Sequence, residues 1–479
     1  MIFHSLIFLV FFITTTIVYW RLPHRAQNVL LVAASYFFYG YVHPWFLTLI
    51  AMTTIADYCA ARGMERWPSR KRLMLGLSLA VNLGLLGFFK YFGFFVDNVH
   101  VVLALFGLDV PRPALAIVLP VGISFYTFQE LSYTIEVYRG TLRARRDFID
   151  FAAFVCFYPQ LVAGPIERAS RLLPQVESPR VWSWPAARSA AWLIAWGYFK
   201  KLVIADNVGV IANKVFSLDA PGFTVLWAGV FAFAMQIYAD FSAYSDIARG
   251  VARWLGFDLM VNFNHPYMAT GPADFWRRWH ISLSTWFRDY VYIPLGGSRR
   301  GRARTLGNIF ITFLVSGLWH GASWNYALWG AYHGVLLIVT RLIGGVRPKT
   351  AGRTRSDAWA VLEPLQVATM FVLACIGWLM FRETDIHMLL RDLSLSPWTT
   401  TLVDREVGRY LFVLTAIYAA PLWLHDIWSV YIAPALRPRD DEADWSWRAV
   451  GQALLAGLAL AAILVFRSQQ SLDFIYFKF

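Results

Sequence analysis

Three histidines in the middle of the chain most suggest a functional site. His320 follows the apolar run Leu306–Ser316, His333 lies in the next apolar run, and His280 stands among tryptophans and arginines. An imidazole titrates near neutral pH, and a titratable side chain at membrane depth is costly unless it faces a protein interior or a hydrated cavity. Such a group is by default a candidate for catalysis or transport, although each histidine could instead serve packing alone.

His320 lies deep in a predicted helical hairpin. The first arm begins at Leu306 and ends in GLWHG, the second covers Tyr326–Thr340, and both outer loops are basic. At 1.5 Å per residue, His320 lies about 20 Å along the first arm, which is membrane depth. Gly317 and Gly321 have no side chain, so another backbone or a substrate could approach closely. His320 is therefore the first candidate.

The segment Asp274–Tyr290 (DFWRRWHISLSTWFRDY) carries His280 and is expected to form an amphipathic helix. At 100° per residue, its aromatic and arginine side chains fall on opposite arcs, with His280 at the edge of the aromatic arc. Such a helix lies in the membrane interface or enters the membrane partway, so its apolar face would carry the imidazole inward. His280 could equally be an ordinary interfacial residue, and His333 a packing residue.

A second polar group, YADFSAYSD at Tyr238–Asp246, ends an apolar run. Its two carboxylates and four hydroxyls are too many for a helix that faces lipid. They must line a cavity, pair with cations such as Arg277 or Arg278, or lie beyond the bilayer edge. Structural pairing that braces the site is an open alternative.

Two apolar segments contain proline and glycine, which indicates broken helices. They are LPVGISFYTFQ at Leu119–Gln129 and FYPQLVAGPIER at Phe157–Arg168, the second suited to a re-entrant segment. Broken helices at membrane depth are tolerated where they line protein or water-filled space, in enzymes, channels and transporters alike. The sequence has no phosphate-cradling glycine loop, no Gly-x-Ser-x-Gly elbow and no Cys/His zinc spacing, and we expect no metal.

The composition indicates that these groups belong to an all-α, polytopic membrane protein. Of the 479 residues, 58% are hydrophobic and 15% charged, against roughly 25% charged in soluble domains, which excludes an ordinary water-soluble fold. Runs near the ~20 apolar residues that cross a bilayer, together with weaker ones, predict about eleven transmembrane helices plus re-entrant or interfacial helices. We expect a single membrane domain over residues 1–479. The strongest runs are Ile2–Trp20, Leu73–Phe89, Phe223–Tyr238, Gln366–Phe381 and Ala449–Val465.

The net charge of +13 reflects topology more than nucleic-acid binding, because the basic residues lie in short loops between apolar runs. The first apolar run lacks a preceding basic region and a following small-residue cleavage site, so we expect it to be retained as a helix. With the basic loops inside, the N-terminus is outside, in a multi-pass protein of the cytoplasmic (inner) membrane whose surroundings are the lipid bilayer. Those loops are Arg21–Arg25, Arg62–Arg72, Arg299–Arg304 and Arg341–Arg355.

Four motifs, in their order along the chain, closely resemble the membrane-bound O-acyltransferase (MBOAT) family. They are LPVGISFYTFQ, YADFSAYSD, WRRWHISLSTWFRDYVYIPLGG and GLWHGASWNYALWGAYHG. The nearest resemblance is to the bacterial AlgI/DltB branch, which contains alginate O-acetylases and teichoic-acid D-alanylation proteins, and the closing FIYFKF resembles the alginate members. The similarity runs from the N-terminus to about Phe381, with a signature core at about residues 115–340.

The resemblance implies an O-acyltransferase, in particular an O-acetyltransferase, that moves an acyl group from a cytoplasmic donor to an acceptor hydroxyl through a tunnel. The family's two signature histidines fall on His280 and His320, with His320 as the principal catalytic residue. A neutral imidazole could take the hydroxyl proton as the oxygen attacks a thioester carbonyl, then release it to the thiolate. Supporting or tunnel-lining roles fall to Asp240, Ser242, Tyr244, Asp246, Trp276, Arg277, Arg278, Trp279, Trp319, Asn325, His333 and Gln129.

The resemblance also implies what the chain works with. The donor would be acetyl-CoA or another acyl thioester, as a substrate and not a bound cofactor. A periplasmic SGNH-type acetyltransferase would complete the transfer within a polysaccharide secretion machinery, onto an extracellular polysaccharide of alginate or cellulose type. D-alanyl transfer to teichoic acid, acetylation of peptidoglycan and a transporter or flippase for a polar substrate are the alternatives. Gln160 stands where the alginate proteins have histidine, which leaves the acceptor open.

Overall fold

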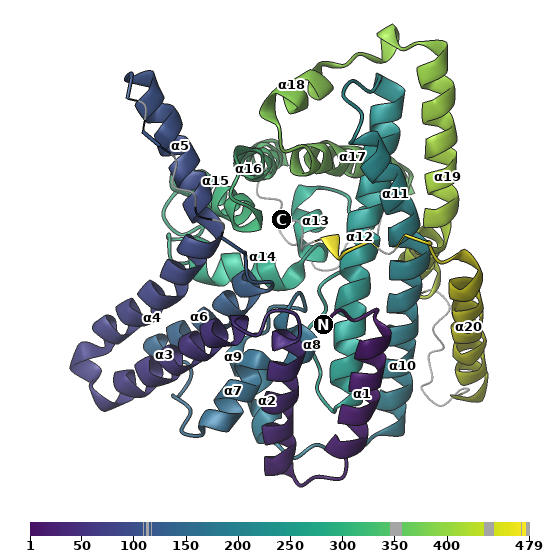
Figure 1. Cartoon of the computed structure of the whole chain (residues 1–479). Helices are drawn as coiled ribbons and strands as arrows, with labels where there is room; N and C mark the ends of the chain where they lie inside the picture. Colours follow the sequence, from purple (N-terminus) through teal and green to yellow (C-terminus); the bar gives the residue numbers. More distant parts are fainter. Residues whose placement is uncertain are drawn as a thin grey trace. The chain divides into compact units, whose positions relative to one another are not determined.

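The computed structural model describes residues 1–108, 110–111, 115, 117–344, 357–434, 445–470 and 472–475, and every regular element in these residues is a helix (Figure 1). The predicted all-α fold is confirmed. The chain forms two compact units. Unit 1 contains Met1–Ile194 and Ile247–Met260, and unit 2 contains Ala195–Asp246 and Val261–Phe479. A single domain over residues 1–479 stays a prediction.

Several helices suit a lipid bilayer. In the described part of the chain, five helical stretches are long and apolar enough to cross a membrane, and two apolar helices are shorter. Each of the strongest predicted runs overlaps one of these seven helices, so a polytopic membrane protein is confirmed, while the number of about eleven spans stays a prediction. The long stretches are Pro68–Leu105, Phe223–Trp254, Trp324–Ile343, Leu362–Arg382 and Leu402–Ile432, and the short ones are Leu6–Tyr19 and Leu454–Phe466.

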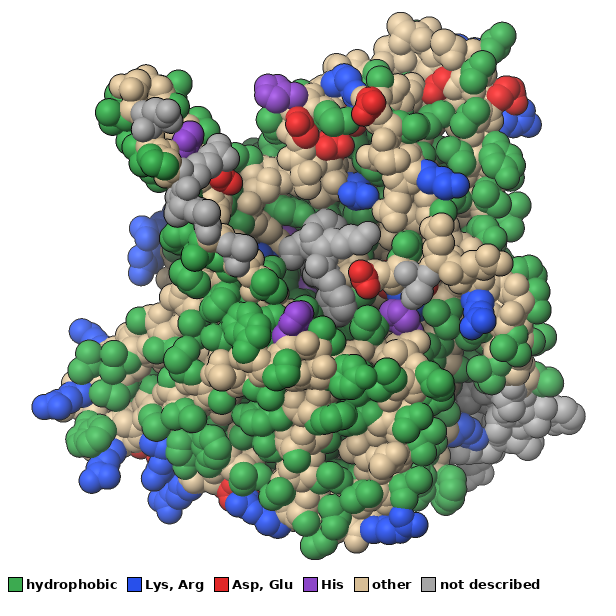
Figure 2. All heavy atoms as spheres, in the orientation of Figure 1, with side chains coloured by type: hydrophobic (Ala, Val, Ile, Leu, Met, Phe, Trp, Pro, Cys, Tyr) green, Lys and Arg blue, Asp and Glu red, His purple; other side chains and the backbone are tan. Residues whose placement is uncertain are grey.

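The surface of unit 1 has the character of a membrane protein. Leu6 and Leu73 are 76% and 55% exposed, as expected of side chains that face lipid. In the face shown in Figure 2, hydrophobic side chains cover the flanks of the unit 1 helices, and Lys and Arg side chains gather at the helix ends. The basic cluster Arg341–Arg355 and the closing FIYFKF lie partly outside the described residues. The helices of unit 1 are α1 (Leu6–Tyr19), α2 (His24–Gly40), α3 (Phe46–Arg66), η1 (Pro68–Arg70), α4 (Lys71–Leu86), η2 (Gly87–Tyr91), α5 (Phe92–Leu105), α6 (Ile123–Arg139), α7 (Phe148–Cys156), α8 (Tyr158–Leu161), α9 (Ala169–Glu177) and the first part of α10 (Trp184–Phe199).

Of the two predicted breaks, the second is present between α7 and α8 at Phe157, whereas at the first the described residues before Gly122 are not helical and a helix begins there. Helix α6 begins directly after Gly122, whose left-handed φ of 80° suits glycine. A Cβ at Gly122 would stand 2.7 Å from the carbonyl oxygen of Leu161, at the end of the single turn α8. The two broken segments therefore touch, which sequence spacing alone does not reveal.

Unit 2 contains the predicted hairpin, formed by α15 (Arg302–His320) and α16 (Trp324–Gly344). A Cβ at Gly317 would lie 2.2 Å from the carbonyl oxygen of Tyr326, and one at Gly330 would lie 2.3 Å from the carbonyl oxygen of Phe313. Backbone atoms cannot rotate away as a side-chain tip can, so glycine at both positions lets the two helices meet. The other elements of unit 2 are η3 (Lys200–Ala205), α11 (Asp206–Val215), α12 (Phe223–Trp254, which ends in unit 1), η4 (Pro266–Met268), α13 (Pro272–Arg278), α14 (Ile281–Phe287), η5 (Arg288–Tyr292), α17 (Asp357–Arg382), α18 (Ile386–Ser394), η6 (Pro397–Thr399), α19 (Leu402–Ile427), η7 (Trp428–Ile432) and α20 (Trp445–Phe466).

The close contact between the two hairpin arms at Gly317 predicts that adding one methyl group there lowers the stability of the protein. We expect Gly317→Ala to destabilise the protein by about 1–3 kcal/mol, because overpacking against backbone forces the helices apart. The measurement is the thermal unfolding midpoint in detergent micelles. Gly307→Ala in the same helix is the matched control, because a Cβ at Gly307 meets no atom within 4 Å. Equal midpoints for the two variants would show that the glycine contact does not hold the hairpin.

Candidate active site

His280 lies at a break between two short helices and not on one continuous helix. Helix α13 ends at Arg278, α14 begins at Ile281, and His280 between them has a left-handed φ of 41° and is fully buried. The prediction of a continuous amphipathic helix with His280 at its interfacial edge is therefore wrong. Left-handed backbone is uncommon for a residue other than glycine, so contacts beyond the segment must hold it.

Asn262 supplies those contacts. Its side-chain oxygen accepts a hydrogen bond of 2.8 Å from the Ser282 hydroxyl and lies 3.2 Å from Nδ1 of His280, while its backbone oxygen accepts from the Ile281 amide at 2.9 Å. An amide oxygen only accepts, so the ring proton is on Nδ1 and the lone pair on Nε2. Asn262 thus orients the ring for proton acceptance at Nε2. Sequence reasoning missed this residue, because it lies in a preceding loop with no helical periodicity.

Burial lowers the pKa of the His280 imidazole to about 3, so the ring is neutral at pH 7. In the unfolded chain the imidazole has its ordinary pKa of about 6.5, so below that pH it binds a proton that it does not bind in the folded chain. The contribution of His280 to stability is therefore complete above pH 6.5 and is lost as pH falls from about 6.5 towards 3.

This titration predicts a difference in acid sensitivity. Between pH 6.5 and 4.5 the wild type should lose stability faster than His280→Asn, by up to about 1.4 kcal/mol per pH unit. Asparagine tolerates the left-handed backbone and does not titrate, so the comparison isolates the imidazole. Unfolding midpoints measured at several pH values give the two slopes. Parallel slopes would contradict the assignment.

His320 is the last residue of α15 and is enclosed by aromatic rings. Its ring centroid lies 5.1 Å from that of Trp319, 5.0 Å from Trp329 and 5.3 Å from Phe381, and the side chain is buried. The Trp319 indole also lies 6.1 Å from the His280 ring. The structure thus brings both predicted histidines to one indole, from segments that are separate in the sequence.

His333 joins the same group of rings. It lies 4.9 Å from Trp329, which also contacts His320, and 5.1 Å from Trp276. A Cβ at Gly377 of α17 would stand 2.8 Å from Nε2 of His333, so the missing side chain makes room for the imidazole. We call this group the imidazole–indole cluster, which consists of His280, Trp319, His320, Trp329 and His333.

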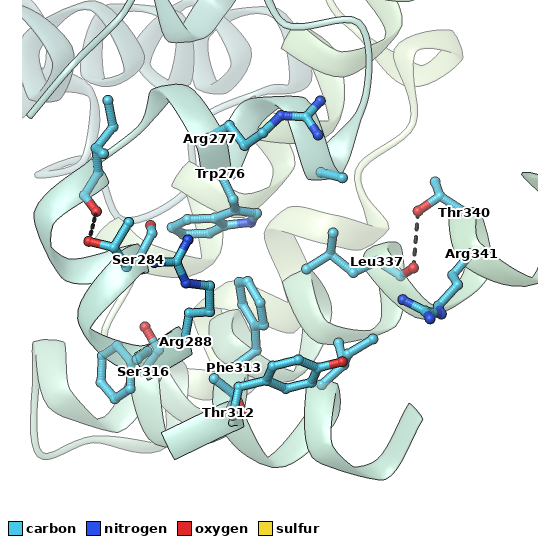
Figure 3. A pocket seen from close by; sticks show the side chains of 16 residues that line it. Trp276, Arg277, Ser284, Arg288, Thr312, Phe313, Ser316, Leu337, Thr340 and Arg341 are labelled. Atoms are coloured by element: carbon cyan, nitrogen blue, oxygen red, sulfur yellow. Dashed lines mark hydrogen bonds between the residues drawn. The ribbon is translucent and has the colours of Figure 1, made fainter. Parts of the chain in front are cut away.

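A pocket of about 670 Å³ adjoins the imidazole–indole cluster (Figure 3). Trp276 lines the pocket and also contacts Trp329 and His333, while Ser316 lines it one helical turn before His320. The volume is that of a small-molecule site, and the lining is largely apolar. Its arginines are Arg277, Arg288 and Arg341.

The polar group on α12 is paired with lysines and not with the predicted arginines. Lys201 lies 3.1 Å from Asp240 and Lys200 lies 2.7 Å from Asp246, whereas both arginines pair with Asp274. The Lys200 ammonium also donates to the hydroxyl of Ser242 at 2.8 Å. The carboxylates are thus paired with cations that sequence reasoning did not name, and a supporting or tunnel-lining role of this polar group stays a prediction. The two arginines are Arg277 and Arg278.

The last described residues of the chain reach this polar group. The backbone amide of Ile475 donates to Oδ2 of Asp240 at 2.8 Å, and the ring of Phe474 lies 4.5 Å from Tyr244. Phe241, next to Asp240, lies 4.7 Å from the His280 ring. The terminal segment is thus tied to a helix that also contacts the predicted catalytic residue, a link that no sequence signal indicated.

The remaining residues predicted from the sequence to be supporting or tunnel-lining lie in different parts of the structure. Asn325 donates to the carbonyl oxygen of Met380 at 3.3 Å and so joins α16 to the end of α17. Trp279 is buried with its ring 4.7 Å from Trp378. Gln129 belongs to unit 1, where its side chain donates to the backbone of α7. A tunnel-lining role for these residues stays a prediction.

Comparisons with known proteins point to one family. A family model described as the membrane-bound O-acyltransferase family matches residues 138–380, which include all three histidines of the imidazole–indole cluster. The chain is 37% identical to the probable alginate O-acetylase AlgI of Pseudomonas putida, with both chains covered completely. It is 40% identical to the probable alginate O-acetylase AlgI of Pseudomonas aeruginosa, over 88% of this chain and 80% of the relative. It is 30% identical to the peptidoglycan O-acetyltransferase of Helicobacter pylori, over 96% and 94%. The chain therefore belongs to the membrane-bound O-acyltransferase family and is an O-acyltransferase.

Proposed function

We propose that the protein passes an acetyl group from a cytoplasmic thioester, such as acetyl-CoA, across the inner membrane for O-acetylation of an extracellular polysaccharide of alginate or cellulose type. The observation that carries the proposal is the imidazole–indole cluster beside an apolar pocket with arginines in its wall. The alginate O-acetylases among its relatives favour acetyl as the group and a polysaccharide as the acceptor.

The pocket is the proposed donor site. Arginine binds phosphate groups through paired N–H donors, so Arg277, Arg288 and Arg341 suit the phosphates of a coenzyme or carrier thioester. The apolar wall that contains Trp276 and Phe313 suits the thioester arm and keeps water from it. Arg288→Ala and Arg341→Ala should then raise the donor KM more than they lower kcat.

His320 is the proposed general base. As the acceptor oxygen attacks the thioester carbonyl, a ring nitrogen of His320 takes the hydroxyl proton. The carbon–sulfur bond then breaks, and the imidazolium returns the proton to the departing thiolate. This step needs a neutral imidazole, and aromatic rings enclose the ring of His320. His280, held by Asn262, supports the site through the Trp319 indole, which also lies next to His320.

The proposal includes an orientation and partners. The N-terminus is outside and the basic loops are in the cytoplasm, following the distribution of Lys and Arg. A periplasmic SGNH-type acetyltransferase completes the transfer within the secretion machinery, since the sequence offers no serine elbow of its own. The chain is thus necessary for acetylation but not sufficient.

The test is the O-acetyl content of extracellular polysaccharide from cells that lack the gene. Acetyl groups should be lost and should return on complementation with the wild type. Unchanged polysaccharide acetylation with loss of acetyl groups from peptidoglycan would favour the second candidate, which the Helicobacter pylori relative supports. Loss of D-alanyl esters from teichoic acid would instead favour a third candidate function, D-alanyl transfer to teichoic acid. A transporter predicts that flux of a polar substrate survives loss of the His320 imidazole.

A further inference from the structure

Unit 2 holds a second group of histidines that takes no part in the imidazole–indole cluster. His265 comes from the loop before α13, and His425 and Asp426 are neighbours near the end of α19. Nδ1 of His265 lies 2.7 Å from Oδ1 of Asp426, and Nδ1 of His425 lies 3.2 Å from the same oxygen. We propose that these three side chains bind a divalent transition metal, Zn²⁺ by preference, in what we call the His265–His425–Asp426 site.

The spacing fits zinc. Tetrahedral zinc holds nitrogen and oxygen ligands at about 2.0–2.2 Å, which places two ligand atoms about 3.3 Å apart. The separation of 3.2 Å between His425 and Asp426 already matches, and that of 2.7 Å between His265 and Asp426 needs to open by roughly half an ångström. One ligand atom from each residue lies within 4.8 Å of the others, so small side-chain movements complete the site.

The donor atoms select the class of metal. The hydroxyl of Tyr238 donates to Oδ2 of Asp426 at 2.8 Å, which leaves Oδ1 as a single carboxylate ligand. Two imidazole nitrogens and one carboxylate oxygen favour transition metals, whereas Mg²⁺ and Ca²⁺ prefer shells of oxygen. A hydrogen bond to the second carboxylate oxygen is also the kind of outer contact that orients a metal ligand.

The two imidazoles are held in place and remain reachable. The His425 ring lies 4.8 Å from Trp196, and His265 has a left-handed φ of 49°, in which its ring meets Asp426. His265 and His425 are 21% and 36% exposed, so water or a small ligand can take the fourth position. Because His265 and Asp426 are 161 residues apart, no motif spacing could indicate the site, and the proposal departs from the expectation of no metal.

A bound metal would cross-link the loop before α13 to the end of α19. That loop also contains Asn262, which holds His280 in its left-handed conformation. The metal would therefore stabilise the segment that positions His280 without touching the reacting atoms. This role is independent of which acyl group or acceptor the protein uses.

The test uses the full-length protein in detergent micelles, purified with a tag that contains no histidine and stripped with a chelator. Zn²⁺ alone is titrated against a fluorescent zinc indicator, and bound metal is counted by mass spectrometry after gel filtration. The wild type should bind one Zn²⁺ per chain, and His265→Asn and Asp426→Asn should bind at least tenfold more weakly. His387→Asn, at an exposed histidine of α18, is the control and should bind like the wild type.

Two further readouts distinguish the loss of zinc binding from a folding defect of the variants. His265→Asn keeps a residue that tolerates left-handed backbone, and zinc should raise the unfolding midpoint of the wild type but not of this variant. Co²⁺ in place of Zn²⁺ should give the intense visible absorption of tetrahedral coordination in the wild type. Zinc binding that is equal in the wild type and the His265→Asn/Asp426→Asn double variant would overturn the proposal, and would leave His265 and His425 as hydrogen-bond partners of Asp426.

Discussion

His320→Ala should lower acyl transfer by about 10²–10⁴-fold, the usual contribution of a positioned general base. The reason is the loss of the group that is proposed to move the hydroxyl proton, in a site where the side chain is buried among aromatic rings. The aromatic rings around His320 would remain, so substrate binding should change less than turnover. Transfer is measured with a radiolabelled acetyl donor in membrane vesicles that contain equal amounts of each variant.

The controls separate proton transfer from packing. His320→Gln keeps a polar side chain of similar reach but cannot accept and return a proton at neutral pH, so it should be as inactive as His320→Ala. His387→Ala at an exposed position should retain full activity. Substantial transfer by His320→Gln would assign His320 a packing role and transfer its proposed function to another residue.

Lys201→Met should destabilise the protein by about 3–5 kcal/mol, the cost of removing one partner from a buried ion pair. The Lys201 ammonium lies 2.9 Å from Asp206 and 3.1 Å from Asp240, and all three side chains are almost completely buried. It also donates to the backbone oxygen of Leu472 at 2.9 Å. Without it, two carboxylates face each other in the interior and the terminal segment loses one of its anchors.

The size of that loss can be tested with two further variants. Lys214→Met on the exposed side of α11 is the matched control and should leave the unfolding midpoint nearly unchanged. Adding Asp240→Asn to Lys201→Met should recover part of the lost stability, because one buried charge is then removed. Equal midpoints for Lys201→Met and Lys214→Met would contradict the buried ion pair.

What the sequence could predict depends on how far apart the interacting residues lie. The hairpin that carries His320 was predicted correctly, because its apolar arms, its glycines and its basic outer loops are all local signals. The interruption in the segment that contains Pro159 is predicted for the same reason, as is the irregular backbone at Gly122, where a helix begins. Residues that are close in the sequence determine the backbone conformation at these positions.

The interpretation of His280 failed because a distant residue decides its conformation. Helical periodicity over Asp274–Tyr290 describes the pattern of side chains correctly, yet Asn262 holds His280 at a left-handed break. The partners of Asp240 and Asp246 were missed in the same way. Lys200 and Lys201 follow an apolar helix, and only packing against α12 shows that they, and not Arg277 or Arg278, neutralise the carboxylates.

The contact of Gly317 with Tyr326 and of Gly330 with Phe313 has a mechanical consequence. At these two positions no side chain lies between α15 and α16, so the helices cannot shift past each other there without separating. We therefore expect an acceptor to reach His320 without separation of these two helices. Of the three rings described around His320, Phe381 at the end of α17 is the one that comes from neither arm of the hairpin.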